Sequence, residues 1–181
     1  MSNALIDVIM QRRSVRAYQD KPVSMADLQQ IVTCAINAPS ARNMQPWRIA
    51  MVTDAGLLNE MNAAACRAFS ADRPEFAQPG ATIFYGAPAV LFVAGRKDST
   101  FSGIDCGHLT ENACIAAQAL GLGTVIAAMW RGAFAGPEAK GFMEKLGFSD
   151  EYEFKHGISI GYAAQQPDAR ERDASLVTWV G

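Results

Sequence analysis

The chain has 181 residues, a length that fits one domain over residues 1–181 with a buried core. Half of the residues are hydrophobic, and the formal net charge of −2 offers no positive field to attract nucleic acid or an anionic membrane, so neither partner is expected. The four cysteines form no CxxC pair, and Arg12 and Arg13 follow the first apolar stretch instead of preceding it as in a signal peptide. A cytoplasmic location is therefore expected.

The hydrophobic pattern predicts interleaved helices and strands. The first half should form an amphipathic helix over residues 5–12, a helix that Ser24 opens with a capping box and Pro39 ends, a strand over 48–53, and a helix that Asp54 caps and that runs to about residue 68. Prolines predict a loop over residues 70–80. The second half should form a strand over 89–94 covered on both faces, a long helix over 104–120, a strand over 124–129, a helix over 137–146 closed by Gly147, and strands over 154–162 and 175–180.

Residues 112–130 carry no charge and are numerous enough to cross a bilayer. The segment Gly121-Leu122-Gly123-Thr124 interrupts this run, with a helical pattern before it and β-branched residues after it, which favours helix, tight turn and buried strand. This turn holds the only GxG of the chain, and it follows a helix and precedes a strand. A dinucleotide fingerprint needs the opposite order, so the classical nucleotide-binding fold is disfavoured.

The first cluster of candidate functional residues is Arg12-Arg13-Ser14-Val15-Arg16, directly after the first predicted helix. Guanidinium groups match phosphate geometry, and a shielded charge-assisted hydrogen bond contributes roughly 1.5–3 kcal/mol. Taken alone, the cluster favours the alternative interpretation, a solvated basic helix end that complements the helix dipole.

The second cluster lies in the loop over residues 38–47, where Asn43 and Gln45 stand between prolines. Side-chain amides donate and accept hydrogen bonds without adding charge, as the edge of a planar heterocycle requires. The alternative interpretation is a proline-punctuated turn that only links a helix to a strand.

The third cluster is Arg170-Glu171-Arg172, shortly before the last predicted strand. A spacing of two in an extended segment places both guanidinium groups on one side, where they could form a second phosphate clamp. A solvated surface pair is the alternative.

Metal and acyl-transfer chemistry each lack a complete set of residues. Asp105, His108 and Glu111 share one shifting face of the long predicted helix while Cys106 points away, so no metal site is expected. Ser14 has no histidine nearby in the sequence, and no GxSxG motif occurs.

Three motifs in order resemble the nitroreductase family: R-R-S-x-R-x-Y, then A-P-S-x-x-N-x-Q-P-W, and downstream A-x-G-L-G. The resemblance runs over about residues 9–179. The resemblance implies an α+β fold with a central, mostly antiparallel sheet flanked by helices, in an interlocked homodimer with FMN at the interface. It also implies that the flavin is held by Arg12, Arg13, Ser14 and Arg16, by Pro39, Ser40, Asn43 and Gln45 of the other subunit, by Arg170 and Arg172 at the phosphate, and by backbone N–H groups near Ala127 and Ala128 at flavin N5. Residues 175–180 would pack across the partner.

The implied activity is that of an oxidoreductase with NADH or NADPH as electron donor. Hydride would pass through flavin N5 to a nitroaromatic, a quinone or a similar small-molecule acceptor in a ping-pong cycle. Many relatives place a lysine under the flavin pyrimidine, but no lysine lies between Asp54 and Ala94, so Arg16 is expected to stabilise the reduced flavin's negative charge. Ring desaturation, dehalogenation and FMN binding without catalysis stay open as alternatives, as do the acceptor and the nicotinamide preference.

Overall fold

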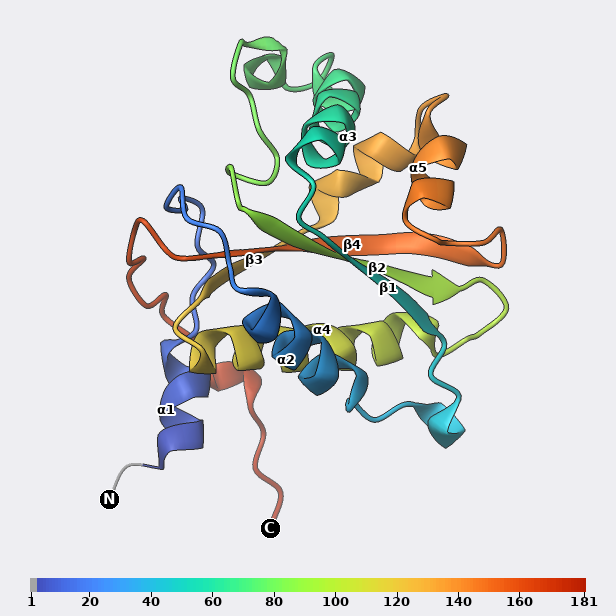
Figure 1. The fold of residues 1–181 in the computed structure, drawn as a ribbon. Helices are drawn as coiled ribbons and strands as arrows, with labels where there is room; N and C mark the ends of the chain where they lie inside the picture. The colour runs from blue at the N-terminus through green and yellow to red at the C-terminus, as the bar shows by residue number, and fades with distance from the viewer. Residues whose placement is uncertain (1–2) are drawn as a thin grey trace.

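The computed structural model describes residues 3–181, which form a four-stranded sheet covered by helices on both faces (Figure 1). The strands pair antiparallel throughout in the order β1-β2-β4-β3, with bounds β1 Trp47–Val52, β2 Ala89–Arg96, β3 Gly123–Ala127 and β4 Tyr152–Gly161. The helices are α1 Ala4–Gln11, α2 Met25–Ile36, α3 Ala55–Phe69, α4 Ser102–Ala119 and α5 Ala139–Lys145. Short 3-10 turns are η1 Ala41–Asn43, η2 Pro74–Ala77, η3 Ala128–Phe134 and η4 Ala174–Leu176. The predicted α+β fold with an antiparallel sheet is confirmed.

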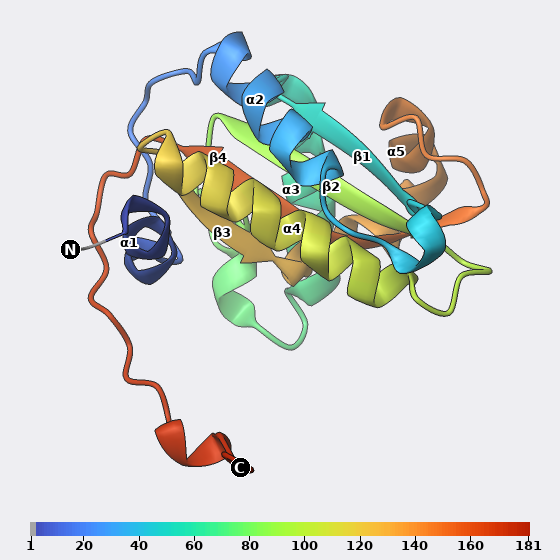
Figure 2. The ribbon, with the colours of Figure 1, turned by 90° about the horizontal axis from the view of Figure 1, so that it is seen from below.

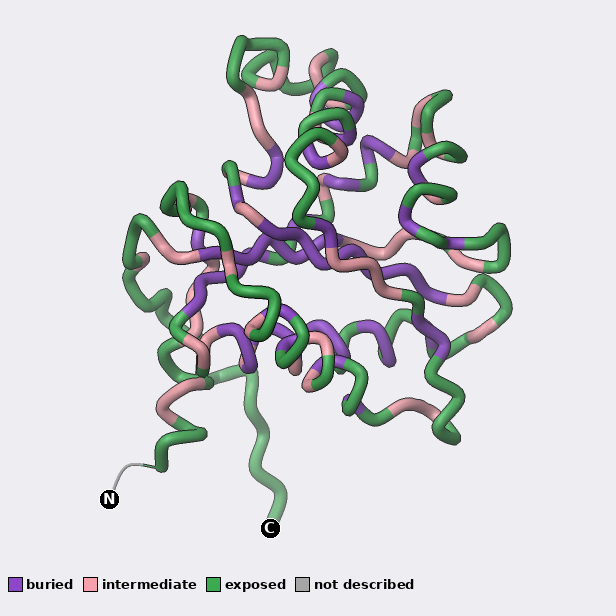
Figure 3. The backbone as a smooth tube through the Cα atoms, in the orientation of Figure 1, coloured by how far each residue is buried: buried purple, intermediate pink, exposed green. Residues whose placement is uncertain are grey.

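Strand β2 divides the interior into two cores, because its side chains alternate between the two faces of the sheet. Leu91 and Val93 pack with residues of α2 and α4, whereas Val90, Phe92 and Ala94 pack with residues of α3 and η3. All five side chains are fully buried, and the middle of the sheet is buried in Figure 3 as well. The prediction that residues 89–94 form a strand covered on both faces is confirmed.

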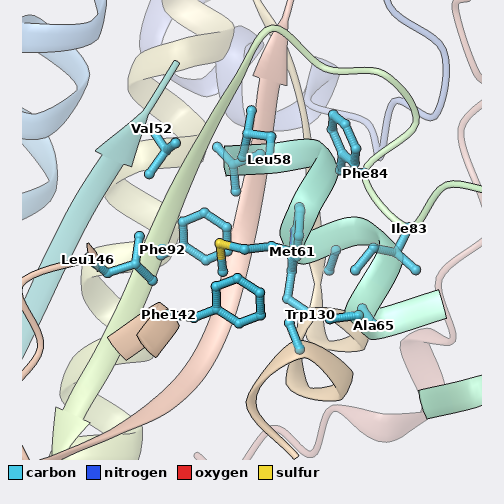
Figure 4. Close-up of a cluster of buried hydrophobic side chains, with 14 of the residues drawn as sticks. Val52, Leu58, Met61, Ala65, Ile83, Phe84, Phe92, Trp130, Phe142 and Leu146 are labelled. Atoms are coloured by element: carbon cyan, nitrogen blue, oxygen red, sulfur yellow. The ribbon is translucent and has the colours of Figure 1, made fainter. Parts of the chain in front are cut away.

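The core above the sheet is built around Trp130, which lies against Phe92 with ring centroids 4.9 Å apart (Figure 4). Met61 and Phe142 complete this cluster and are buried. The indole ring lies directly on β4 at Gly157, where a Cβ atom would be only 2.5 Å from Trp130 Cδ1. The close approach of ring and strand therefore requires glycine at this position.

Local signals in the sequence set several element boundaries. Ser24 Oγ accepts a hydrogen bond from the Asp27 N–H at 3.1 Å, and Asp54 Oδ1 accepts one from the Leu57 N–H at 2.7 Å, so both predicted N-caps are confirmed. The chain turns at Gly121 and Gly147 with φ angles of 75° and 71°, conformations that favour glycine. No described helix is both long enough and apolar enough to cross a membrane.

Most predicted helices and strands begin and end within about two residues of the observed ones, and two predictions near β3 and the C-terminus need correction. The strand expected over residues 124–129 ends at Ala127, because the chain turns into η3 there. The final strand expected over 175–180 was wrong: this segment holds the end of the turn η4 and lies away from the body of the molecule (Figure 2). A strand needs a backbone partner, and the described part of this chain offers none there.

Candidate functional site

A cavity of about 640 Å³ lies between α1, the segment that follows α1, and the C-terminal segment. It brings together the first and third sequence clusters, which stand near opposite ends of the chain. We call it the arginine cavity, and it is lined by Ile9, Met10, Arg12, Arg13, Ser14, Arg16, Glu111, Pro167, Asp168, Ala169, Arg170 and Arg172. Six of the predicted cofactor-binding residues are in this lining, and five of these six are arginines.

The segment after α1 is held against the open edge of β3, the outermost strand of the sheet. The Val15 N–H donates to the Thr124 carbonyl oxygen at 2.9 Å. Val15 comes this close because Gly123 has no side chain: a Cβ there would be 2.7 Å from Val15 Cγ2. From the other side, the Tyr18 hydroxyl donates to the Val15 carbonyl oxygen at 3.0 Å, and burial raises the pKa of Tyr18 above its ordinary value. The edge of β3, the missing side chain of Gly123 and the Tyr18 hydroxyl thus fix Val15, and with it the arginines on either side.

The lining of the arginine cavity is strongly positive, with five arginines against the carboxylates of Glu111 and Asp168. Arg12 Nε lies 3.5 Å from Glu111 Oε1 on α4. Arg13 Nη1 donates to the Met10 and Arg12 carbonyl oxygens at 2.7 and 2.8 Å, which turns its head back toward α1. A half-enclosed group of guanidinium forks is suited to binding a phosphate, which accepts bidentate hydrogen bonds.

The second sequence cluster lies at a different place in the same chain. Ser40 Oγ accepts from the Gln45 N–H at 3.0 Å, and Gln45 Nε2 donates to Asn43 Oδ1 at 3.2 Å, so the loop is bonded to itself. Pro39, Asn43 and Gln45 are exposed. In Figure 2 this loop lies near the beginning of α4, whereas α1 lies near its end. Within residues 3–181 the lining of the arginine cavity includes none of Pro39, Ser40, Asn43 and Gln45.

The end of β3 lies on the same sheet edge as Val15, with Ala127 buried and Ala128 exposed. Backbone groups of a strand point alternately to its two sides. Thr124 bonds to Val15 on the open side, so Ile126 also turns its N–H to that side, while Ala127 faces its partner Gly157 on β4. Ile126, whose side chain is 43% exposed, is therefore a candidate that sequence reasoning missed. The sequence carries no signal for this role of Ile126, because which side its N–H faces depends on how β3 pairs with β4.

Residues considered for a metal site are engaged elsewhere. Asp105 accepts from the Ala41 N–H, and Glu111 pairs with Arg12. Across residues 3–181, no three His, Cys, Asp or Glu side chains gather as metal ligands. His156 lies against Thr110 between α4 and β4, and burial, together with Lys155, lowers its pKa to about 4. A neutral imidazole that is half-buried against Thr110 has a packing role there.

A model of the nitroreductase family matches residues 9–162 of this chain. A protein of Archaeoglobus fulgidus, provisionally named an NADH dehydrogenase/NAD(P)H nitroreductase, is 31% identical over 173 residues, which are 93% of this chain and 90% of that protein. The crystal structure of a nitroreductase with bound FMN from Desulfitobacterium hafniense matches at a TM-score of 0.93 with 30% identity, covering 100% of both chains. A second FMN-bound nitroreductase structure, from Bacteroides fragilis, matches at 0.91 with 26% identity, covering 99% of this chain and 100% of that one. On the match to the family model and to these relatives, the chain belongs to the nitroreductase family.

Proposed function

We propose that this chain binds FMN and transfers hydride from NADH or NADPH to a small acceptor such as a nitroaromatic or a quinone, in a ping-pong cycle. The observation that carries the proposal is the arginine cavity, in which two separate sequence clusters meet. The FMN bound in the relatives from Desulfitobacterium and Bacteroides supports the cofactor, and the name of the Archaeoglobus relative supports the nicotinamide donor. In this proposal residues 1–181 act as a single FMN-binding domain.

The cavity residues fit the phosphate end of FMN. A phosphate monoester carries between one and two negative charges at neutral pH and presents three acceptor oxygens. Arg12, Arg170 and Arg172 would hold it by bidentate hydrogen bonds, with the Ser14 hydroxyl as a further donor and Arg13 adding positive charge. When bound, FMN supplies the ring whose N5 accepts and releases the hydride.

Arg16 is the proposed source of positive charge at the pyrimidine edge of the flavin. It lines the arginine cavity, and its Nη1 donates to the Ser14 carbonyl oxygen at 3.3 Å. The cations between Asp54 and Ala94 are Arg67 and Arg73, and each is paired with a glutamate on the α3 side of the sheet. Arg16 therefore takes the electrostatic role of the missing lysine. At N5 we propose the N–H of Ile126, on the open side of β3, and that of Ala128 after the strand, because the Ala127 N–H faces β4 and the expectation for that residue was wrong.

A homodimer would complete the site. The loop that carries Asn43 and Gln45 lies outside the arginine cavity of its own chain, so we propose that it reaches the flavin bound by a second copy. Apolar surface supports this assembly: Leu5, Ile6, Ile9 and Met10 of α1 are largely exposed, and Trp179 and Val180 in the C-terminal tail are 91% and 93% exposed. Exposed apolar patches of this kind are typical of protein interfaces.

The test is the visible absorption spectrum of the purified protein before and after anaerobic addition of NADH or NADPH. We expect a yellow protein whose flavin bands bleach, and Arg16→Ala should weaken FMN binding or slow the bleaching. Arg67→Ala is the matched control, since it removes an exposed arginine of α3 that does not line the cavity. A yellow protein that neither nicotinamide bleaches would instead be an FMN-binding protein without this activity. A colourless protein that takes up no added FMN would refute the flavin assignment.

A further inference from the structure

The loop between α2 and β1 is held in an unusual backbone conformation. Arg42, Asn43 and Gln45 have φ angles of 53°, 56° and 46°, in the left-handed region that side chains other than glycine disfavour. Three such residues within four positions would relax if nothing held them. Asn43 and Gln45 are also the two amides assigned to the flavin in the proposed function.

One buried carboxylate bonds to this loop from another element. Asp105, in the first turn of α4, is 3% exposed, and its Oδ1 and Oδ2 accept from the Ala41 N–H at 3.2 and 3.3 Å. Ala41 directly precedes Arg42, the first of the left-handed residues. The carboxylate thus reaches across to the loop at the point where the unusual conformation begins.

The position of Asp105 argues against a purely helix-capping role. Phe101 occupies the N-cap of α4, and no side-chain hydrogen bond caps this end. Within residues 3–181 none of the ion pairs includes Asp105, so its buried charge has no lysine or arginine partner. Burying a carboxylate is unfavourable unless hydrogen bonds compensate it, and here the compensating donor outside α4 is the loop itself.

We propose that Asp105 is a positioning residue, which holds the loop over residues 40–45 in the conformation that presents Asn43 and Gln45 to the cofactor. The proposal rests on the proposed function for the identity of the ligand. The holding of the loop itself rests only on the observed bonds. Asp105 does not contact the cofactor in this scheme; it acts through Ala41.

The loop offers a direct readout without any cofactor, because Arg42 is exposed and is followed by a bond that trypsin can cleave. We would measure the rate of tryptic cleavage after Arg42 in the cofactor-free full chain, for the wild type, Asp105→Ala and Asp105→Asn. Thr110→Val is the matched control, since Thr110 is also buried on α4 and bonds within α4 and to His156, not to the loop. Thermal unfolding of each variant separates global destabilisation from loop release.

Asp105→Ala should be cleaved after Arg42 about 10-fold faster than the wild type and bind FMN about 10-fold more weakly, the effect of losing one charge-assisted hydrogen bond. Asp105→Asn keeps one acceptor oxygen and should lie in between. The comparison uses each Asp105 variant that folds. If its rate of cleavage after Arg42 and its FMN affinity both equal those of Thr110→Val, Asp105 does not position the loop. A wild type that binds no FMN would refute the proposed function, and the cleavage rates would still decide whether Asp105 holds the loop.

Discussion

We expect the substitution Gly123→Ala to displace residues of the arginine cavity, although Gly123 itself does not line the cavity. Gly123 begins β3 under Val15, and a Cβ there would lie 2.7, 2.9 and 3.1 Å from Val15 Cγ2, Cβ and Cγ1. Carbon atoms in contact are normally about 3.5–4.0 Å apart. Val15 would therefore have to move by about 1 Å, and it cannot do so without stretching its hydrogen bond to Thr124.

The size of the effect follows from this geometry. Forcing one extra methyl group into a packed site costs about 1–3 kcal/mol of unfolding free energy. A binding site needs its groups within about 0.5 Å of their productive positions, so displacing Ser14 and Arg16 should cost at least one charge-assisted hydrogen bond. We expect FMN affinity to fall about 10-fold or more, since 1.4 kcal/mol corresponds to a factor of ten.

The assay is a flavin fluorescence titration combined with urea unfolding. Gly141→Ala is the matched control, because Gly141 lies in α5 and nothing is within 4 Å of its added Cβ. Adding Val15→Ala to the Gly123 variant removes two of the three clashing atoms and should restore part of the affinity. Wild-type affinity in the Gly123 variant, at a stability no lower than that of the Gly141 variant, would refute the reasoning.

Three further outcomes are expected. Arg172→Ala should weaken FMN binding and reduce the salt dependence of that binding, whereas Arg67→Ala should leave both unchanged. The measurement is an FMN titration at two salt concentrations, and equal effects of the two substitutions would contradict the assignment of Arg172 to the phosphate. Burial lowers the pKa of His156 from 6.5 to about 4, so the imidazole binds a proton more tightly in the unfolded chain than in the folded one. The free energy of unfolding should therefore fall by up to about 3 kcal/mol as the pH drops from about 6.5 to about 4. His156→Gln should lose most of that pH dependence in urea unfolding, and an unchanged slope would show that other groups cause it. Gly157→Ala places a Cβ 2.5 Å from Trp130 and should lower unfolding free energy by at least about 1–3 kcal/mol, which a shift in the urea midpoint measures.

The parts of the fold that depend on local chemistry could be predicted from the sequence. The apolar run of β2 required cover on both faces, and Ser24 and Asp54 capped the helices they were expected to cap. Positive-φ turns fell at Gly121 and Gly147 because glycine is the residue that adopts them without strain. The residue types of the clusters also indicated which ligand groups they suit, since guanidinium groups match phosphates and side-chain amides match the edge of a planar heterocycle.

Which of the sequence clusters share a site could be learned only from the folded chain. The arginines after α1 and those in the C-terminal segment meet at one cavity, and no local signal relates two segments so far apart in the chain. Strand pairing selected Ile126 at the open edge of β3, and the absence of a partner within residues 3–181 left 175–180 without a strand. The role suggested for Asp105 likewise depends on Ala41, a distant residue that the fold brings within hydrogen-bonding distance. Caps and turns depend on residues that are neighbours in the sequence, so the sequence pattern reveals them. A binding site joins residues that are distant in the sequence, and only the packing of the folded chain brings these together.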